Sequence, residues 1–185
     1  MVIPYSLSQI PSQDRPQSGR AHRLLYEWEA LEKALKDRKD IILKVLKTNH
    51  EGLPVRYEVE YLIRCISGIK EDQSPRFHER FRMEITLPER YPQVDAPPSF
   101  RFVGDVLPWH PNICYHGEMA GRVCLNMLST NTDLAWGVLR IALYLRYELY
   151  HAIQEPPYPE DLKVAYWVRH YGEPNEWIFY DQDDK

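Results

Sequence analysis

The chain has 185 residues, which suits one domain of ordinary size with a sizeable core. Hydrophobic residues make up 44% of it and charged residues 27%, a composition typical of a soluble, globular protein. The formal net charge of −4 argues against electrostatic binding to nucleic acid, which requires a basic surface, so we expect no nucleic-acid partner.

The chain also lacks the sequence signals of a membrane or exported protein. No stretch reaches the roughly 18 apolar residues that span a bilayer. The first residues, MVIPYSLSQIPSQDRP, lack the basic start and unbroken apolar run of a signal peptide. We therefore expect a cytoplasmic protein with no membrane partner. Its cysteines, Cys65, Cys114 and Cys124, are too few and odd in number for a disulfide framework, which allows one of them to be a reactive thiol.

The predicted elements begin after a polar segment. Residues 1–21 are rich in Ser, Gln and Pro and show no periodicity, so we expect a flexible N-terminal arm. Leu24, Trp28, Leu31 and Leu35 then follow at spacings of 4, 3 and 4. This spacing places them on one face and predicts an amphipathic helix over 23–37.

Four strands are predicted next. Residues 41–48 form a short apolar run that ends at a turn signal. Hydrophobic residues alternate with polar ones over 56–66 and again over 77–87, which is the period of half-buried strands. Residues 99–103 are the fourth candidate, with Phe100 and Phe102 facing inward. The short connections favour an antiparallel meander.

An irregular stretch precedes the predicted C-terminal helices. Periodicity disappears between 107 and 136, and a compact domain rarely keeps about 30 irregular residues without a use for them. A helical stripe then ends before Pro156, and a shorter helix is predicted over 160–170. The stripe comprises Val138, Ala142, Leu145, Leu149 and Ala152. Strands grouped together with helices at both ends indicate an α+β fold.

Short motifs flank the irregular stretch. They are Tyr91-Pro92 and Pro97-Pro98 before the fourth strand, His110-Pro111-Asn112, and Gly121-Arg122-Val123-Cys124-Leu125. A lone His-Pro-Asn is a weak signal, whereas this ordered combination resembles the ubiquitin-conjugating enzyme family. The resemblance covers about residues 22–170. It implies a catalytic domain at 22–172, with an N-terminal helix, a four-stranded antiparallel sheet, an active-site loop and C-terminal helices, and a C-terminal tail at 173–185.

The resemblance implies an acyl transfer in two steps. A ubiquitin-like protein passes from an activating enzyme to Cys124 as a thioester, and the amine of a target lysine then attacks the thioester carbonyl. A thiol suits this task because thiolate is both a strong nucleophile and a good leaving group. No cofactor is implied, because ATP is consumed at the activating enzyme. The family uses its first helix to dock that enzyme.

The resemblance also assigns roles within the motifs. Cys124 is the nucleophile, although a small buried hydrophobe is the alternative for any single cysteine. Asn112 steadies the oxyanion or the active-site loop, unless it only forms a turn. His110 and Pro111 are structural parts of that loop, with the His110 ring bonded to nearby backbone. Asp161 orients and deprotonates the incoming lysine, unless it only complements a helix dipole.

The chain departs from the family pattern around Cys124. Twelve positions separate Asn112 from Cys124, which is more than usual, and the extra residues lie within 114–120, a segment that we name the insertion loop. Asn126 occupies a position where many members carry an acid. Such departures suggest a remote branch, for example the bacterial antiviral conjugation systems, in which a conjugating enzyme is encoded beside an activating enzyme and a deconjugating metalloprotease.

The sequence leaves two other functions open. One is a non-catalytic module that binds ubiquitin-like proteins on the same fold, but such variants typically lack the cysteine. The other is a zinc-stabilised domain, since His110, Cys114, His116 and Cys124 are all zinc-ligand types. Their spacing matches no common zinc arrangement, so we predict no metal site. Contact with the ubiquitin-like partner or the substrate is the simpler use of the insertion loop.

Overall fold

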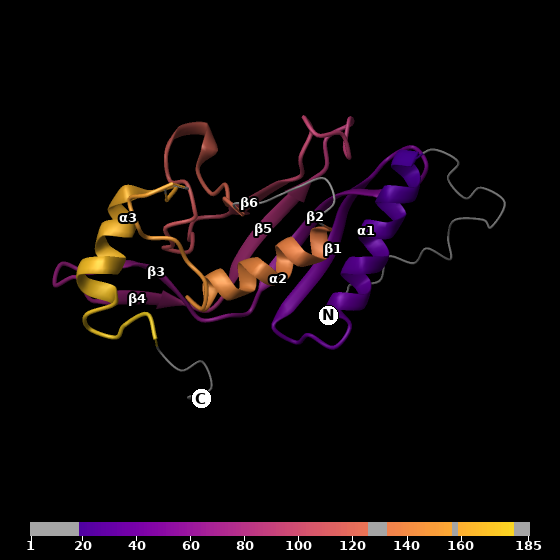
Figure 1. Cartoon of the computed structure of the whole chain (residues 1–185). Coiled ribbons are helices and arrows are strands. Elements are labelled where there is room, and N and C mark those ends of the chain that lie inside the picture. Colours follow the sequence, from indigo (N-terminus) through magenta and orange to yellow (C-terminus); the bar gives the residue numbers. More distant parts are fainter. Residues whose placement is uncertain (1–18, 126–132, 157–158, 180–185) are drawn as a thin grey trace.

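A computed structural model describes residues 19–125, 133–156 and 159–179 of the chain (Figure 1). The elements in chain order are α1 (Gly19–Leu35), β1 (Ile41–Thr48), β2 (Pro54–Tyr61), β3 (Cys65–Ile69), β4 (Pro75–His78), β5 (Phe81–Thr86), β6 (Ser99–Val103), the short helix η3 (Gly117–Met119), α2 (Leu134–Leu145), α3 (Leu162–Trp167) and η4 (Val168–Gly172). Most of the expected N-terminal arm, Asn126 and residues 180–185 of the expected tail lie outside the described residues.

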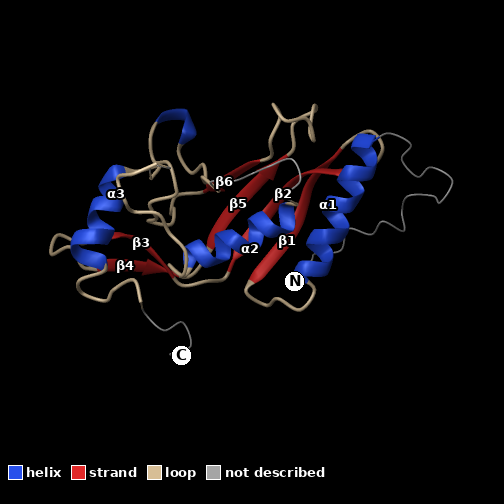
Figure 2. Cartoon of the chain, in the orientation of Figure 1, coloured by secondary structure: helices blue, strands red, loops and turns tan. Residues whose placement is uncertain are grey.

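The main sheet has four strands in the order β1-β2-β5-β6, and every neighbouring pair is antiparallel. This arrangement confirms the predicted α+β meander (Figure 2). The bounds of β1 and β6 are those predicted from the apolar runs at 41–48 and 99–103. Phe100 and Phe102 are both buried, as expected from their alternation with polar residues.

The prediction of two long strands over 56–66 and 77–87 was wrong. Each is broken, so that β3 and β4 form a separate two-stranded sheet with antiparallel pairing. The alternation misleads because Ile63 stays buried in the break between β2 and β3. The period of the hydrophobic residues indicates which of them face the core. The ends of a strand depend instead on where the backbone changes its hydrogen-bonding partner.

Helices α1 and α2 contact each other and cover the inner face of the main sheet (Figure 1). Trp28 of α1 stacks on Tyr57 of β2, with ring centroids 6.4 Å apart. Tyr61 donates a hydrogen bond to the Val138 carbonyl of α2 at 3.0 Å. The predicted apolar stripe of α1 is buried, although the helix begins at Gly19 and ends at Leu35 rather than spanning 23–37.

A buried carboxylate joins α1 to α2. Glu27 Oε1 accepts hydrogen bonds from Arg23 Nε at 2.7 Å and from the Tyr91 hydroxyl. Glu27 Oε2 accepts the N–H of Leu134, the first residue of α2, at 2.7 Å. Because the Glu27 side chain is fully buried, these three donors replace the water that it loses on folding.

The predicted long helix over the stripe from Val138 to Ala152 was also wrong, because α2 ends at Leu145. Tyr147 has a φ of +55°, a left-handed conformation that stops the helix. Leu149 and Ala152 still pack into the core, so the apolar spacing continues after the helix has ended. The later helical segment is shifted from the predicted 160–170: α3 starts at Leu162 and continues directly as the π-helix η4, which ends at Gly172.

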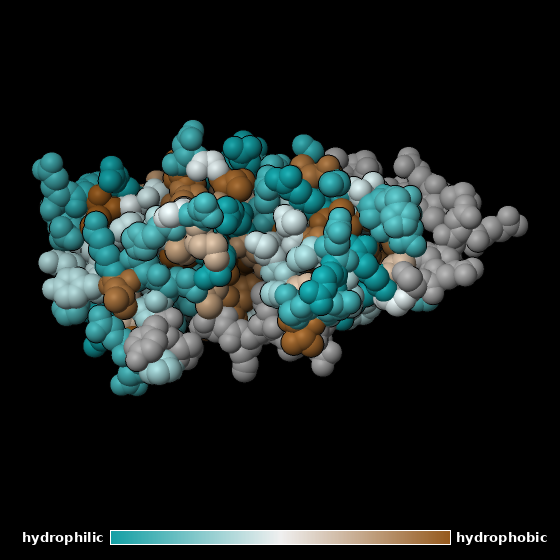
Figure 3. All heavy atoms as spheres, turned by 90° about the horizontal axis from the view of Figure 1, so that it is seen from above, coloured by the Kyte–Doolittle hydropathy of each residue, from teal (hydrophilic) through white to brown (hydrophobic). Residues whose placement is uncertain are grey.

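Part of the expected tail packs on the domain. Ile178 is buried in the core, and Trp177 stacks on Trp167 of α3 with centroids 6.4 Å apart. Hydrophilic residues cover most of the face seen in Figure 3, with hydrophobic residues between them in small groups. In the described parts of the chain, no helix is both long and apolar enough to span a bilayer.

Candidate functional site

The segment that leads to Cys124 extends the main sheet beyond β6. Residues 121–123 run antiparallel to β6 on one side and to residues 112–114 on the other. The Phe102 N–H of β6 donates to the Gly121 carbonyl at 2.8 Å. Cys124 therefore follows backbone that is held from both sides, although the sequence around it gives no helix or strand signal.

Gly121 makes this close approach to β6 feasible. Its φ is +83°, and a Cβ at this position would lie 2.2 Å from the Phe102 carbonyl oxygen. A side chain would therefore push the segment away from the sheet, besides straining the backbone. This close contact explains why the motif has a glycine at position 121, three residues before the cysteine.

Cys124 is half-buried, and both of its backbone polar groups are bonded. Its N–H donates to the Asn112 carbonyl at 2.9 Å, and its carbonyl accepts the Tyr144 hydroxyl of α2 at 3.3 Å. Cys65 differs, because full burial raises the pKa of its thiol and disfavours the reactive thiolate. Cys114 is half-buried in the insertion loop, and none of the three cysteines is in a disulfide.

Asn112 is almost fully buried beside Cys124. Its side-chain Oδ1 accepts the N–H of His151 at 3.0 Å, which fixes the orientation of the amide. With Oδ1 used in this way, Nδ2 is the end of the amide that can donate to another group. Asn112 thus has both of the features required of the roles implied for it: it ties two chain segments together, and it retains a donor.

His110 is fully buried, and both of its ring nitrogens have partners. Nδ1 accepts the Asn112 N–H at 3.2 Å, and Nε2 lies 3.2 Å from the Leu149 carbonyl. The ring stacks on Tyr144 with centroids 4.9 Å apart. Burial lowers the pKa of His110 to about 3, so the ring is neutral near pH 7. These contacts suit a part of the loop's framework rather than a base.

Stability will therefore depend on pH through His110. Its folded-state pKa lies below the ordinary value of 6.5, so the unfolded state takes up the proton first and stability falls as pH drops from about 6.5 toward about 3. The contribution of His110 to the free energy of unfolding then falls by up to about 1.4 kcal/mol per pH unit. His110→Gln, which offers an acceptor and a donor but does not titrate, should show a shallower loss. Urea unfolding from pH 7 to pH 4 measures the difference, and equal slopes would contradict it.

Asp161 is the N-cap of α3 and is almost fully buried. Its Oδ1 accepts the Val164 N–H at 2.9 Å, which is the ordinary contact of a capping aspartate. Its Oδ2 lies 2.9 Å from His116 Nε2 of the insertion loop. The backbone N–H groups of Glu160 and Asp161 both point to the Pro111 carbonyl, at 2.9 and 3.3 Å. Pro111 thus joins the His-Pro-Asn motif to the start of α3.

The insertion loop is tied down at several points and contains η3 (Figure 2). At its base, the Cys114 N–H donates to the Arg122 carbonyl at 3.0 Å. The Tyr115 hydroxyl donates to the Pro108 carbonyl and accepts the His110 N–H. Together with the contact of His116, these bonds anchor the loop to the start of α3, although residues 116–119 remain exposed to solvent.

The described residues contain no group of three or more His, Cys, Asp or Glu side chains arranged to hold a metal ion. In particular, His110 cannot join the hypothetical zinc set with Cys114, His116 and Cys124, because both of its ring nitrogens are used by the backbone. Cys114 and His116 have other contacts, with the His116 carbonyl and with Asp161.

Two contacts of the site were not anticipated from the sequence. The longer spacing between Asn112 and Cys124 left open whether the two residues lie together, and a backbone hydrogen bond joins them. His116 was considered as part of the insertion loop and as a possible zinc ligand, and Tyr144 was given no role. Their contacts with Asp161 and Cys124 join segments far apart in the chain, for which no periodicity or motif exists.

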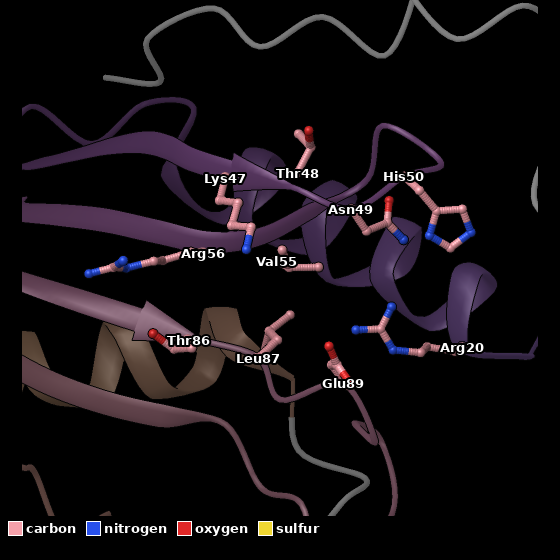
Figure 4. Close-up of a pocket in the computed structure, with 10 residues that line it drawn as sticks. All are labelled: Arg20, Lys47, Thr48, Asn49, His50, Val55, Arg56, Thr86, Leu87 and Glu89. Atoms are coloured by element: carbon pink, nitrogen blue, oxygen red, sulfur yellow. The ribbon is translucent and has the colours of Figure 1, made fainter.

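A pocket of about 720 Å³ lies apart from these residues (Figure 4). It is bordered by the start of α1, the β1–β2 turn and the residues after β5. Arg20, Lys47 and Arg56 line it together with apolar Val55 and Leu87. None of the candidate site residues lines this pocket.

Comparisons with known proteins bear on the family and the fold. The family model for ubiquitin-conjugating enzymes matches residues 35–172. Human ubiquitin-conjugating enzyme E2 K is 36% identical over 86 residues, which cover 46% of this chain and 38% of that protein. Human ubiquitin-conjugating enzyme E2 T is 37% identical over 86 residues, covering 46% and 39%. The chain thus matches less than half the length of these curated relatives.

The fold is shared with a solved structure. The ubiquitin-conjugating enzyme Pex4p of H. polymorpha, solved in complex with the soluble domain of Pex22p, superimposes with a TM-score of 0.55 at 20% identity. The likeness covers 89% of this chain and 97% of that one. At this identity it shows the fold alone, and it confirms the fold expected from the motifs.

Proposed function

Because this chain belongs to the ubiquitin-conjugating enzyme family, we propose that it carries a ubiquitin-like protein as a thioester on Cys124 and transfers it to an amine. The observation that supports this assignment most strongly is the hydrogen bond between the Cys124 N–H and the Asn112 carbonyl. It brings together the two motifs that the family pattern would unite at an active site. Half-burial leaves the thiol accessible to a partner while its backbone is held.

The chemistry follows from the properties of sulfur. The Cys124 thiolate attacks the thioester carbonyl of the loaded activating enzyme, and the enzyme's own thiolate leaves. A lysine amine of the target then attacks the new thioester, a C–N bond forms, and the C–S bond to Cys124 breaks. The partners are a ubiquitin-like protein, its activating enzyme and a target lysine, in the cytoplasm. In a bacterial antiviral system, a deconjugating metalloprotease would remove the ubiquitin-like protein from the target again.

Asn112 is assigned the donor to the oxyanion that develops on the thioester carbonyl, with Nδ2 as the donating atom. His110 and Pro111 hold the loop that positions it, through their bonds to Asn112 and to the residues before α3. A preorganised donor of this kind stabilises a tetrahedral intermediate because its dipole is already aligned before the negative charge forms.

The donor role of Asn112 is separable from its role in the loop. Asn112→Asp keeps an acceptor for the His151 N–H but removes the Nδ2 donor, whereas Asn112→Ala removes both. We expect both variants to slow transfer from the loaded thioester to lysine about 100-fold, as measured in single turnover. If Asn112→Asp transfers at the wild-type rate while Asn112→Ala does not, Asn112 organises the loop only.

Thioester formation tests the proposed function directly. Purified protein is mixed with ubiquitin, a ubiquitin-activating enzyme and ATP, and the products are run on a gel without reductant. Ubiquitin bearing a C-terminal alkyl thioester serves as a second donor, which reaches Cys124 without an activating enzyme. A band larger by one ubiquitin that disappears with added thiol is the expected result. Absence of any thiol-sensitive band with both donors would contradict the proposal.

A further inference from the structure

The insertion loop places an exposed imidazole on the buried carboxylate of Asp161. His116 Nε2 lies 2.9 Å from Asp161 Oδ2. The side chain of His116 is 78% exposed, whereas that of Asp161 is only 4% exposed. A second ion pair, Arg122 to Glu160 at 3.4 Å, ties the base of the loop to the same turn. His116 is therefore the part of this pair that an incoming molecule meets.

Asp161 is poorly placed to meet a lysine by itself. Its Oδ1 accepts the Val164 N–H and caps α3, and its Oδ2 is occupied by His116. An amine would have to displace the imidazole to reach this carboxylate. The deprotonating role implied for Asp161 by the family resemblance is thus better filled, in this chain, by the side chain that covers it.

The pair is linked to Cys124 through the backbone of the His-Pro-Asn motif. Two consecutive carbonyls connect them: that of Pro111 accepts the Asp161 N–H at 3.3 Å, and that of Asn112 accepts the Cys124 N–H at 2.9 Å. The insertion loop itself begins and ends on paired backbone next to Cys124. Figure 1 shows the loop and α3 on the same side of the molecule.

We propose that His116 accepts the proton of the lysine amine as that amine attacks the thioester, with Asp161 orienting the ring. The inference rests on the proposed function of Cys124. With the Nε2–H donated to the carboxylate, Nδ1 carries the lone pair that takes the proton. The C–N bond forms, the C–S bond breaks, the electron pair of that bond remains on the Cys124 thiolate, and the imidazole releases its proton to solvent.

The test is single-turnover discharge of the ubiquitin thioester on Cys124, prepared from ubiquitin with a C-terminal alkyl thioester. His116→Gln should load normally but discharge to free lysine about 100-fold more slowly than wild type at pH 7, within the range of general-base catalysis. Discharge to hydroxylamine, which is unprotonated at neutral pH, should change less than threefold. The difference in the lysine discharge rate between wild type and His116→Gln should narrow toward pH 10. At that pH a large share of the lysine is already unprotonated, so a base in the protein is needed less.

Matched variants separate proton transfer from structure. Asp161→Asn keeps the cap of α3, because Asn caps helices as well as Asp, and it should slow lysine discharge in the same direction. His170→Ala removes an exposed imidazole that stacks on Tyr166 instead, and it should leave discharge unchanged. Two ionisable groups contact His116: its ring lies on Asp161, and the Cys114 thiol lies 3.8 Å from its carbonyl oxygen. The Arg122–Glu160 ion pair adds opposite charges at the base of the same loop.

The outcomes distinguish this inference from the proposed function. If His116→Gln discharges lysine within twofold of wild type, His116 is not the proton acceptor, although Cys124 still carries the thioester. Equal slowing with lysine and hydroxylamine would mean that His116 only shapes the site, which also overturns the inference. Failure of the wild-type protein to load would overturn both.

Discussion

Replacing Cys124 with alanine will abolish the thiol-sensitive ubiquitin adduct, and replacing it with serine will give an adduct that survives reductant. Alanine has no nucleophile, whereas a serine hydroxyl forms an oxygen ester that thiols exchange only slowly. The gel without reductant measures the first result, and the same gel after thiol treatment measures the second. These two variants change a half-buried residue whose backbone hydrogen bonds do not depend on its side chain.

Cys114→Ala is the matched control, since Cys114 is also half-buried and lies on the neighbouring segment. It should load at the wild-type rate. An adduct that persists in Cys124→Ala and disappears in Cys114→Ala would move the nucleophile to the insertion loop and contradict the assignment. A fold that binds ubiquitin but never forms a thiol-sensitive adduct would favour a non-catalytic binding module.

Glu27→Ala will destabilise the domain by about 3–5 kcal/mol, the range for removing one partner of a buried charged pair. The substitution leaves Arg23, the Tyr91 hydroxyl and the Leu134 N–H without the acceptor they share. The loss is large because each donor has already given up water. Urea unfolding followed by circular dichroism measures the free energy of unfolding.

Glu32→Ala is the control for helix propensity and net charge, because Glu32 is exposed on the same helix. Its effect should stay within about 0.5 kcal/mol, as for other surface substitutions. If Glu27→Ala costs less than about 1 kcal/mol, the three donors find other partners and the carboxylate is not the link between α1 and α2 that its contacts indicate.

The fold was largely predictable because its core follows simple periods. The stripe of Leu24, Trp28, Leu31 and Leu35 is buried in α1, and β1 and β6 have the predicted bounds. The breaks after Tyr61 and Leu145 were not predictable in the same way. Burial continues through both, at Ile63 and at Ala152, so the hydrophobic pattern conceals a change in backbone conformation that only tertiary contacts select.

The residues of the candidate site that belong to a sequence motif were predictable, whereas those that enter the site through a tertiary contact were not. The order of the motifs indicated Cys124 and Asn112 as site residues but left open whether they lie together, and a backbone hydrogen bond joins them. The family assigns the lysine-facing acid by position, yet both Asp161 oxygens already have partners in this chain. His116, which contacts Asp161, lies in the insertion loop, whose residues are extra relative to the family pattern. The family pattern therefore could not predict this contact.

The pairing of residues 121–123 with β6 also bears on solubility. A four-stranded open sheet exposes two rows of unpaired backbone groups, which are templates for joining another chain and for aggregation. At β1 that hazard is reduced by Lys44 and Lys47 and by an irregularity in the pairing near Thr48. At β6 it is reduced by the segment before Cys124. The stretch that leads to the thiol therefore also covers backbone groups through which the sheet could pair with another chain.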